Sequence, residues 1–277
     1  MGRLNAVLCM GLMLLAAPAG AAVRLVSLAP NVTELVFAAG AGSRLVGVSE
    51  FSDYPADARR LPRIGNAFRV DEERVIGLAP THVLAWRTGT PPTTIGRLQQ
   101  LGLRVIVLDT QRLDDIAAAI DSIGMLAGTQ VLARRAAGRF RQDLSALRPR
   151  PAVHRPVRVF VEVDDEPLYT VAANHVVNEI ISRCGGRNIF ADLPGVAPVV
   201  TLESVIARDP ELILVADDTV VEPRQLWKRW PELRAVRNQQ VIRIPGDILT
   251  RPTPRILEGA RAVCAAIAGA ESIGASR

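Results

Sequence analysis

Short apolar runs alternate with stretches of helical periodicity from Arg24 to the end of the chain. The segment Val32–Ala39 shows this periodicity between Asn31, a residue type that caps helices, and Gly40, a residue type that ends them. The predicted strands are Leu25–Leu28, Leu45–Val48, His82–Trp86, Arg104–Leu108, Val157–Val161, Leu212–Val215 and Val241–Ile244. Helical stretches between most strands predict an α/β fold with two lobes and mainly parallel central sheets.

The longest helical stretch lies between the fourth and fifth predicted strands. A helix over Asp114–Ala127 ends at Gly128, and Thr129 is placed to cap a second helix that continues to about Leu147. That second helix spans about 28 Å and runs into a proline-rich connector. We therefore predict a first lobe over residues 22–128, a single linking helix over residues 129–148 and a second lobe over residues 149–277.

A short sequence pattern that occurs once in each predicted lobe indicates that the two lobes are related. Glu73 and Glu203 each start a Glu-x-Val-Ile pattern, with Pro80 or Pro210 seven residues later and a strand after it. The dipole of a helix favours a carboxylate in its first turn by about 0.3–1 kcal/mol, which by itself explains either residue. Acids at matching positions in both lobes also suit a partner that presents basic residues twice.

The first residues have the pattern of a secretory signal peptide. Arg3 precedes an apolar run, and Ala19-Gly20-Ala21 forms a small-residue cleavage site. We expect residues 1–21 to be removed and the mature chain to be soluble in the periplasm. Cys184 and Cys264 then remain, as a candidate disulfide in an oxidising compartment or as two unpaired buried thiols.

The composition and the motifs argue against two classes of function. Arginine and lysine total 33 against 28 acidic residues, but the basic residues are spread through the chain, which argues against nucleic-acid binding. Signatures of serine hydrolases, zinc peptidases and phosphate loops are missing from the sequence. His175 and Glu179, at i and i+4, are a candidate metal-ligand pair for a secreted enzyme, although a hydrogen-bonded histidine is the simpler interpretation. We expect no catalytic residue, resident metal or cofactor.

Aromatic and charged residues gather in turn-like segments, several of them directly after a predicted strand. Open α/β sheets bind ligands at the carboxyl ends of their strands, and flat aromatic faces suit a large, planar, partly apolar ligand. The candidate ligand-binding residues are Phe51, Tyr54, Phe68, Trp86, Arg87, Tyr169, Asp247 and Arg251.

Several segments resemble the periplasmic cobalamin-binding proteins of ABC importers. They are Leu28-Ala-Pro-Asn-Val-Thr-Glu-Leu35, Phe51-Ser-Asp-Tyr-Pro55, Ala85-Trp-Arg87, Cys184-Gly-Gly-Arg-Asn-Ile-Phe190 and Pro254-Arg-Ile256. The resemblance covers essentially the whole mature chain. It implies the helical-backbone class of solute-binding proteins, which also holds haem and ferric-siderophore receptors, with the ligand between two lobes joined by one long helix.

The resemblance also implies roles for single residues. Phe51, Trp86, Tyr169, Asp247 and Arg251 match positions that line the corrinoid pocket. Glu73 and Glu203 match two glutamates that dock on the permease dimer, and Cys184 and Cys264 match a disulfide. Ala67, Ala197 and Ile248 stand where the cobalamin binders have tryptophan, with Phe68 next to the first. The expected function is capture of cobalamin or a related corrinoid by a monomer that delivers it to an inner-membrane ABC permease, with a haem or ferric-siderophore receptor as the alternative.

Overall fold

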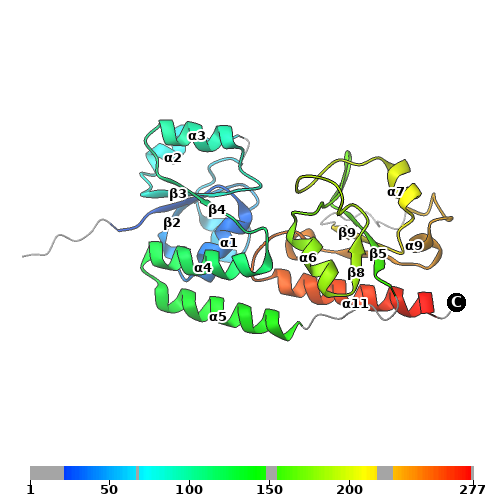
Figure 1. Ribbon diagram of the computed structural model, residues 1–277. Helices are drawn as coiled ribbons and strands as arrows, with labels where there is room; N and C mark the ends of the chain where they lie inside the picture. The colour runs from blue at the N-terminus through cyan, green and yellow to red at the C-terminus, as the bar shows by residue number, and fades with distance from the viewer. Residues whose placement is uncertain (1–21, 67–68, 148–154, 217–226, 276–277) are drawn as a thin grey trace, which may run out of the picture.

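The computed structural model describes residues 22–66, 69–147, 155–216 and 227–275. The described chain forms two α/β lobes that lie side by side (Figure 1). Each lobe is built around a four-stranded parallel sheet, so the fold class predicted from the alternating pattern is confirmed.

The first lobe contains the sheet β2-β1-β3-β4. Its strands are β1 (Leu25–Ser27), β2 (Leu45–Val48), β3 (His82–Trp86) and β4 (Val105–Leu108), and its helices are α1 (Pro30–Ala38), α2 (Glu72–Gly77), α3 (Pro92–Gln100) and α4 (Leu113–Ala127). Short 3-10 helices, η1 (Gly42–Arg44) and η2 (Ala56–Arg60), flank β2. The strands are short and largely apolar, as expected for a parallel sheet covered on both faces.

The second lobe repeats this plan with the sheet β10-β9-β5-β8. Its strands are β5 (Val157–Glu162), β8 (Gly186–Asn188), β9 (Leu212–Ala216) and β10 (Val241–Ile244), and a small antiparallel pair, β6 (Asp164–Asp165) and β7 (Leu168–Tyr169), follows β5. Its helices are α6 (Val176–Arg183), α7 (Leu202–Arg208), α9 (Arg234–Arg237), α10 (Gly246–Leu249) and α11 (Ile256–Ala275). Strands β6, β7 and β8 have two or three residues each, too few to show a hydrophobic period in the sequence.

Two predicted helix caps are wrong in detail. Helix α1 begins one residue before Asn31, at Pro30, because proline suits the first turn of a helix, and Asn31 is buried inside that turn. Thr129 does occupy the cap position of α5 (Gln130–Ala146), but its hydroxyl donates a hydrogen bond to the Ala39 carbonyl at 2.7 Å instead of accepting one from its own helix. Thr129 therefore joins α5 to the end of α1.

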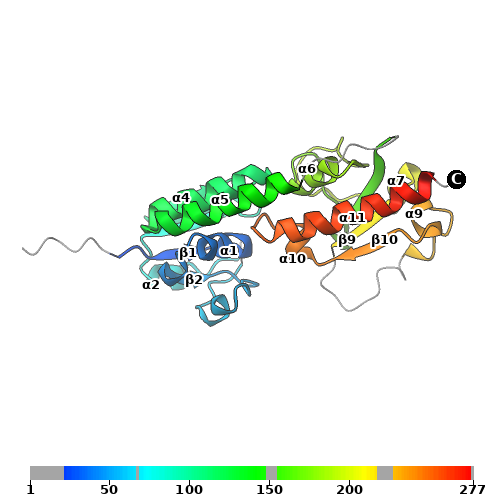
Figure 2. The same ribbon diagram turned by 90° about the horizontal axis from the view of Figure 1, so that it is seen from below.

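Helix α5 lies along α4 on the outside of the first lobe, and Figure 2 shows it running towards the second lobe. The linking helix predicted over residues 129–148 overlaps α5, while residues 148–154 lie outside the described residues. A single cluster of buried apolar side chains extends through both lobes, from Leu35 and Phe140 in the first to Val159 and Leu257 in the second. Two smaller clusters belong to one lobe each.

A disulfide joins Cys184 at the end of α6 to Cys264 in α11, with 4.8 Å between their Cα atoms. This bond closes a sequence separation of 80 residues inside the second lobe. The pairing predicted for these two cysteines is therefore present.

Among the described residues, none of the helices combines the length and the apolar character that a membrane span requires. The predicted signal peptide, residues 1–21, lies outside the described residues.

Candidate functional site

The two lobes meet through the segments that follow their strands. On one side, α1 and the loop after β2 contact residues after β10. On the other side, residues after β4 share a cavity with residues after the β6–β7 hairpin. Because parallel strands place their following loops along one edge of the sheet, side chains distant in the sequence are brought together between the lobes.

The loop after β2 presents two aromatic rings to solvent. Phe51 is 67% exposed and has a backbone φ of 61°, and Tyr54 is 48% exposed. Buried hydroxyls hold the loop from behind, since Ser52 Oγ lies 3.0 Å from Thr33 Oγ1. Arg63 also donates to the Ser52 carbonyl at 2.9 Å. This packing turns the aromatic faces outward, which is the arrangement of a contact surface and not of a core. Phe68, with Ala67, lies outside the described residues.

Trp86, the last residue of β3, is half-buried and held at a fixed angle. Its indole N–H donates to Thr110 Oγ1 at 3.0 Å, and its backbone N–H donates to Thr90 Oγ1 at 3.1 Å. Gly89 packs against the ring, because a Cβ there would lie 2.2 Å from it. The next residue, Arg87, forms an ion pair with Asp109 at 2.8 Å. The indole is therefore fixed by β3 and by the segment that follows β4.

In the second lobe, Tyr169 ends β7 and is half-buried. Asp247 lies in the first turn of α10, and Arg251 follows that helix. The two are joined by an ion pair of 2.7 Å with i, i+4 spacing. Ala197 and Ile248 are exposed and half-buried, respectively.

Asp247 and Arg251 belong to a charged cluster that also includes Glu34 of α1 and Arg255. Arg255 donates to both Glu34 carboxylate oxygens, at 2.7 and 2.9 Å, and its guanidinium lies 4.1 Å from the centre of the Tyr54 ring. Hydrogen bonds to Glu34 raise the pKa of Arg255 above its usual value, against the opposing effect of burial. The sequence reasoning missed Glu34 and Arg255 as site residues. Both stand in segments quoted for the resemblance, and a glutamate on the apolar face of α1 was the available signal.

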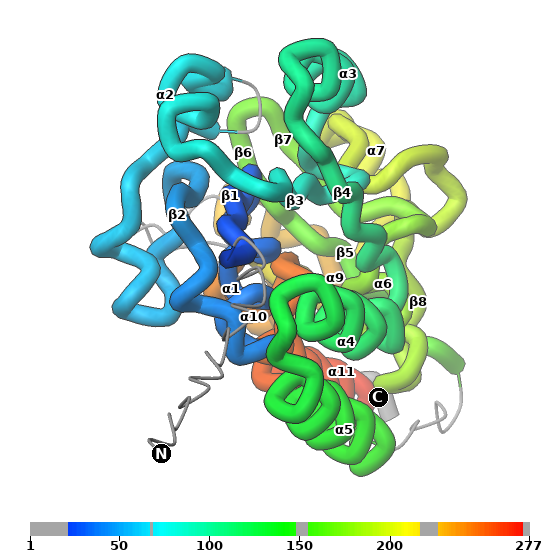
Figure 3. Tube along the Cα trace, turned by 90° about the vertical axis from the view of Figure 1, so that its left-hand side faces the viewer, coloured from blue at the N-terminus to red at the C-terminus, as the bar shows by residue number. Residues whose placement is uncertain are grey.

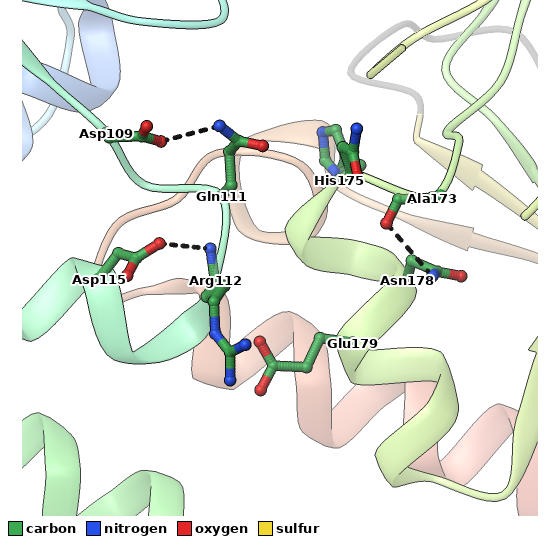
Figure 4. A pocket seen from close by; sticks show the side chains of 9 residues that line it. Asp109, Gln111, Arg112, Asp115, Ala173, His175, Asn178 and Glu179 are labelled. Carbon is green, nitrogen blue, oxygen red and sulfur yellow. Dashed lines mark hydrogen bonds between the residues drawn. The ribbon is translucent and has the colours of Figure 1, made fainter. Parts of the chain in front are cut away.

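A cavity of about 690 Å³ opens between the lobes (Figure 4), and Asp109 in its lining is the partner of Arg87 in the ion pair described above. That volume falls within the 300–1,000 Å³ typical of small-molecule sites. Its lining residues are Asp109, Gln111, Arg112, Asp115, Ala173, Asn174, His175, Asn178 and Glu179. Amide, imidazole and carboxylate groups from both lobes face this space, so it suits the polar edge of a ligand.

His175 and Glu179 both line this cavity, but their contacts are those of structural residues. His175 caps α6, its Nδ1 accepting the Val177 N–H at 3.2 Å, and burial lowers its pKa from 6.5 to about 4. Glu179 accepts the Leu113 N–H from the other lobe at 2.9 Å and pairs with Arg183 at 3.0 Å. In the described part of the chain, no group of three or more histidine, cysteine or acidic side chains is arranged to hold a metal ion.

Glu73 and Glu203 occupy equivalent places in the two lobes. Each is exposed in the first turn of a short helix, α2 or α7, whose cap side chain, Asp71 or Thr201, accepts a backbone N–H. In Figure 1 both helices lie on the upper side of the molecule, one in each lobe, and Figure 3 shows the same side from the end of the first lobe. The repeated sequence pattern that begins at Glu73 and at Glu203 therefore corresponds to a repeated structural unit.

Comparison with known proteins gives a consistent set of relatives. A family model described as periplasmic binding protein matches residues 25–248. The vitamin B12-binding protein of Vibrio cholerae serotype O1 is 38% identical over 242 residues, which cover 87% of this chain and 87% of that protein. The vitamin B12-binding protein of Yersinia pestis strain Pestoides F is 37% identical over 264 residues, covering 95% and 91%.

Solved structures match the fold along nearly the same length. The crystal structure of the periplasmic vitamin B12-binding protein BtuF of Vibrio cholerae has a TM-score of 0.84 and 38% identity, covering 90% of this chain and 98% of that one. The periplasmic haem-binding protein RhuT from Roseiflexus sp. RS-1, in its apo form, has a TM-score of 0.78 and 26% identity, covering 90% and 99%.

Proposed function

The chain belongs to the periplasmic binding protein family, and from this premise we propose that it captures cobalamin or a related corrinoid and delivers it to an inner-membrane ABC permease. The observation that carries the proposal is 38% identity, over 87% of the chain, to a vitamin B12-binding protein. The predicted ligand residues fit this role, because they come from loops of both lobes that approach one another.

We assign the parts of the site by their chemistry. The flat faces of Phe51, Tyr54 and Trp86 suit the planar ring of a corrinoid, since aromatic rings stack through large apolar faces. Tyr169 adds a further face from the second lobe. Arg87, Asp247 and Arg251 suit the amide groups around the ring, and the 690 Å³ cavity gives room for its polar edge.

Transport requires a second surface, and Glu73 and Glu203 supply it in this proposal. Both carboxylates are exposed, one on each lobe, on the side where α2 and α7 lie. Basic residues on a permease dimer would meet them in two equivalent contacts. We propose a monomer that acts in the periplasm after removal of residues 1–21 and that catalyses no reaction.

The alternative within the family is a receptor for haem or a ferric siderophore. One observation supports it, the haem-binding structure at 26% identity. The resemblance adds that Ala197 and Ile248 stand where cobalamin binders are expected to carry tryptophan. A secreted enzyme using His175 and Glu179 is less favoured, because both side chains are engaged in helix capping and inter-lobe contacts.

Ligand titration separates these candidates. The mature protein is titrated with cobalamin, cobinamide, haem and a hydroxamate siderophore while heat and absorbance are followed. Stoichiometric binding of cobalamin or cobinamide, tighter than of the other two, is expected. Tighter binding of haem or the siderophore would move the assignment to the alternative, and turnover of a ligand would favour the enzyme.

A further inference from the structure

A buried carboxylate of the first lobe holds two arginines of the second. The Glu34 side chain is only 3% exposed. Arg255 donates two hydrogen bonds to this carboxylate, at 2.9 and 2.7 Å, and a guanidinium nitrogen of Arg251 lies 3.7 Å from it. Glu34 and Arg255 are separated by 221 positions in the sequence, so this contact depends on how the two lobes are placed.

Burial makes this contact sensitive to the arrangement of the lobes. A carboxylate away from water is unfavourable unless cations and hydrogen bonds compensate it, and Arg255 supplies both. If the lobes moved apart, Glu34 would lose that compensation. The chemistry therefore favours one separation of the lobes over more open ones, even when no ligand is bound.

The same cluster includes proposed ligand residues, while Glu34 itself is buried. The Arg255 guanidinium lies under the Tyr54 ring at 4.1 Å and 3.5 Å from Asp247, while Arg251 pairs with Asp247 at 2.7 Å. Three of the proposed ligand residues are thus oriented by groups that Glu34 holds.

We propose that Glu34 is a positioning residue, which fixes the separation of the lobes and orients Tyr54, Asp247 and Arg251 before the ligand arrives. The expected effect of Glu34 on ligand affinity rests on the proposed function. Its effect on lobe separation is independent of which ligand is bound. A preformed site loses less conformational freedom on binding, so removing the restraint weakens binding mainly through faster dissociation.

The test uses Glu34→Gln, which keeps the size of the side chain and removes its charge. Spin labels are attached to cysteines introduced at Gln100 in α3 and Ala207 in α7, exposed positions on opposite lobes. Pulsed electron paramagnetic resonance then gives the distribution of inter-lobe distances in the ligand-free protein. We expect Glu34→Gln to broaden this distribution, and to weaken binding of the ligand identified by titration at least tenfold, chiefly through the dissociation rate.

Glu211→Gln is the matched control, since Glu211 is also a carboxylate between two arginines, Arg155 and Arg234, but all three lie in the second lobe. It should leave the distance distribution and the affinity unchanged. If the distance distribution of Glu34→Gln is not broadened, the proposal is overturned. It is also overturned if the distribution is broadened but the ligand affinity of Glu34→Gln is unchanged. If the wild-type protein binds none of the four ligands, the proposed function fails while the distance measurement still decides the role of Glu34. Should Glu34→Gln not fold, Arg255→Lys keeps the positive charge, removes the two-pronged contact and is judged by the same two outcomes.

Discussion

Removing the disulfide between Cys184 and Cys264 should cost a large share of the stability of the protein. The bond closes a separation of 80 residues. In the chain-entropy model, a loop of that length restricts the unfolded state by about 4.5 kcal/mol. The native state contributes less to the change, because Cys184 is already buried against α11 and alanine fits the same space.

The assay is urea unfolding of oxidised wild type, reduced wild type and the variant Cys184→Ala/Cys264→Ala. For a denaturant slope of about 3 kcal/mol per molar, the midpoint should fall by about 1.5 M in both reduced and variant proteins. Reduced wild type keeps both sulfur atoms, so agreement between the two isolates the effect of the bond from that of side-chain volume. A shift below about 0.5 M would refute the loop-closure reasoning, and two reactive thiols in the unreduced, denatured protein would refute the pairing itself.

Three further predictions concern single features. Trp86→Ala should weaken ligand binding by about 1–3 kcal/mol, measured by titration, because an oriented stacking face is lost; unchanged affinity would remove Trp86 from the site. Reversing Glu73 and Glu203 together to Arg should abolish uptake in cells while the purified protein keeps its affinity, and each single reversal should give a partial defect; normal uptake would return both residues to a helix-start role. Burial lowers the pKa of His175 from 6.5 to about 4, so the histidine of the unfolded state binds a proton at a higher pH than that of the folded state. The free energy of unfolding should therefore fall by about 2–3 kcal/mol as the pH drops from about 6.5 to about 4. His175→Asn keeps a capping acceptor and should flatten that part of the stability profile; an unchanged profile in denaturation at pH 7, 5.5 and 4 would contradict the assignment.

The sheets of both lobes could be predicted from the sequence because most of their strands are runs of apolar residues, many of them β-branched. The runs Leu45–Val48, His82–Trp86 and Val241–Ile244 begin and end where the structure places β2, β3 and β10. Strand β8 escaped prediction because Gly186, Arg187 and Asn188 have no such pattern, and it forms only by pairing with β5. Its formation is a tertiary effect that local propensity does not contain.

The loops that form the candidate site could be identified from the sequence, but the contacts between their side chains could not. Aromatic residues after strands are visible in the sequence, whereas a pairing such as Glu34 with Arg255 depends on how two lobes face one another. Thr129 shows the same limit on a smaller scale, because its residue type predicts a cap and its neighbour Ala39 decides where the hydroxyl points. Sequence patterns identify which side chains carry chemistry, and packing decides which of them meet.

The apolar cluster that runs through both lobes means that neither half of the chain is a self-contained folding unit. Val159 and Leu257 are buried in the same cluster as Leu35 and Phe140, so a fragment ending after α5 would leave apolar side chains of its own half exposed to water. Two fragments divided at the connector should therefore recognise each other and reassemble, as complementary pieces of one core.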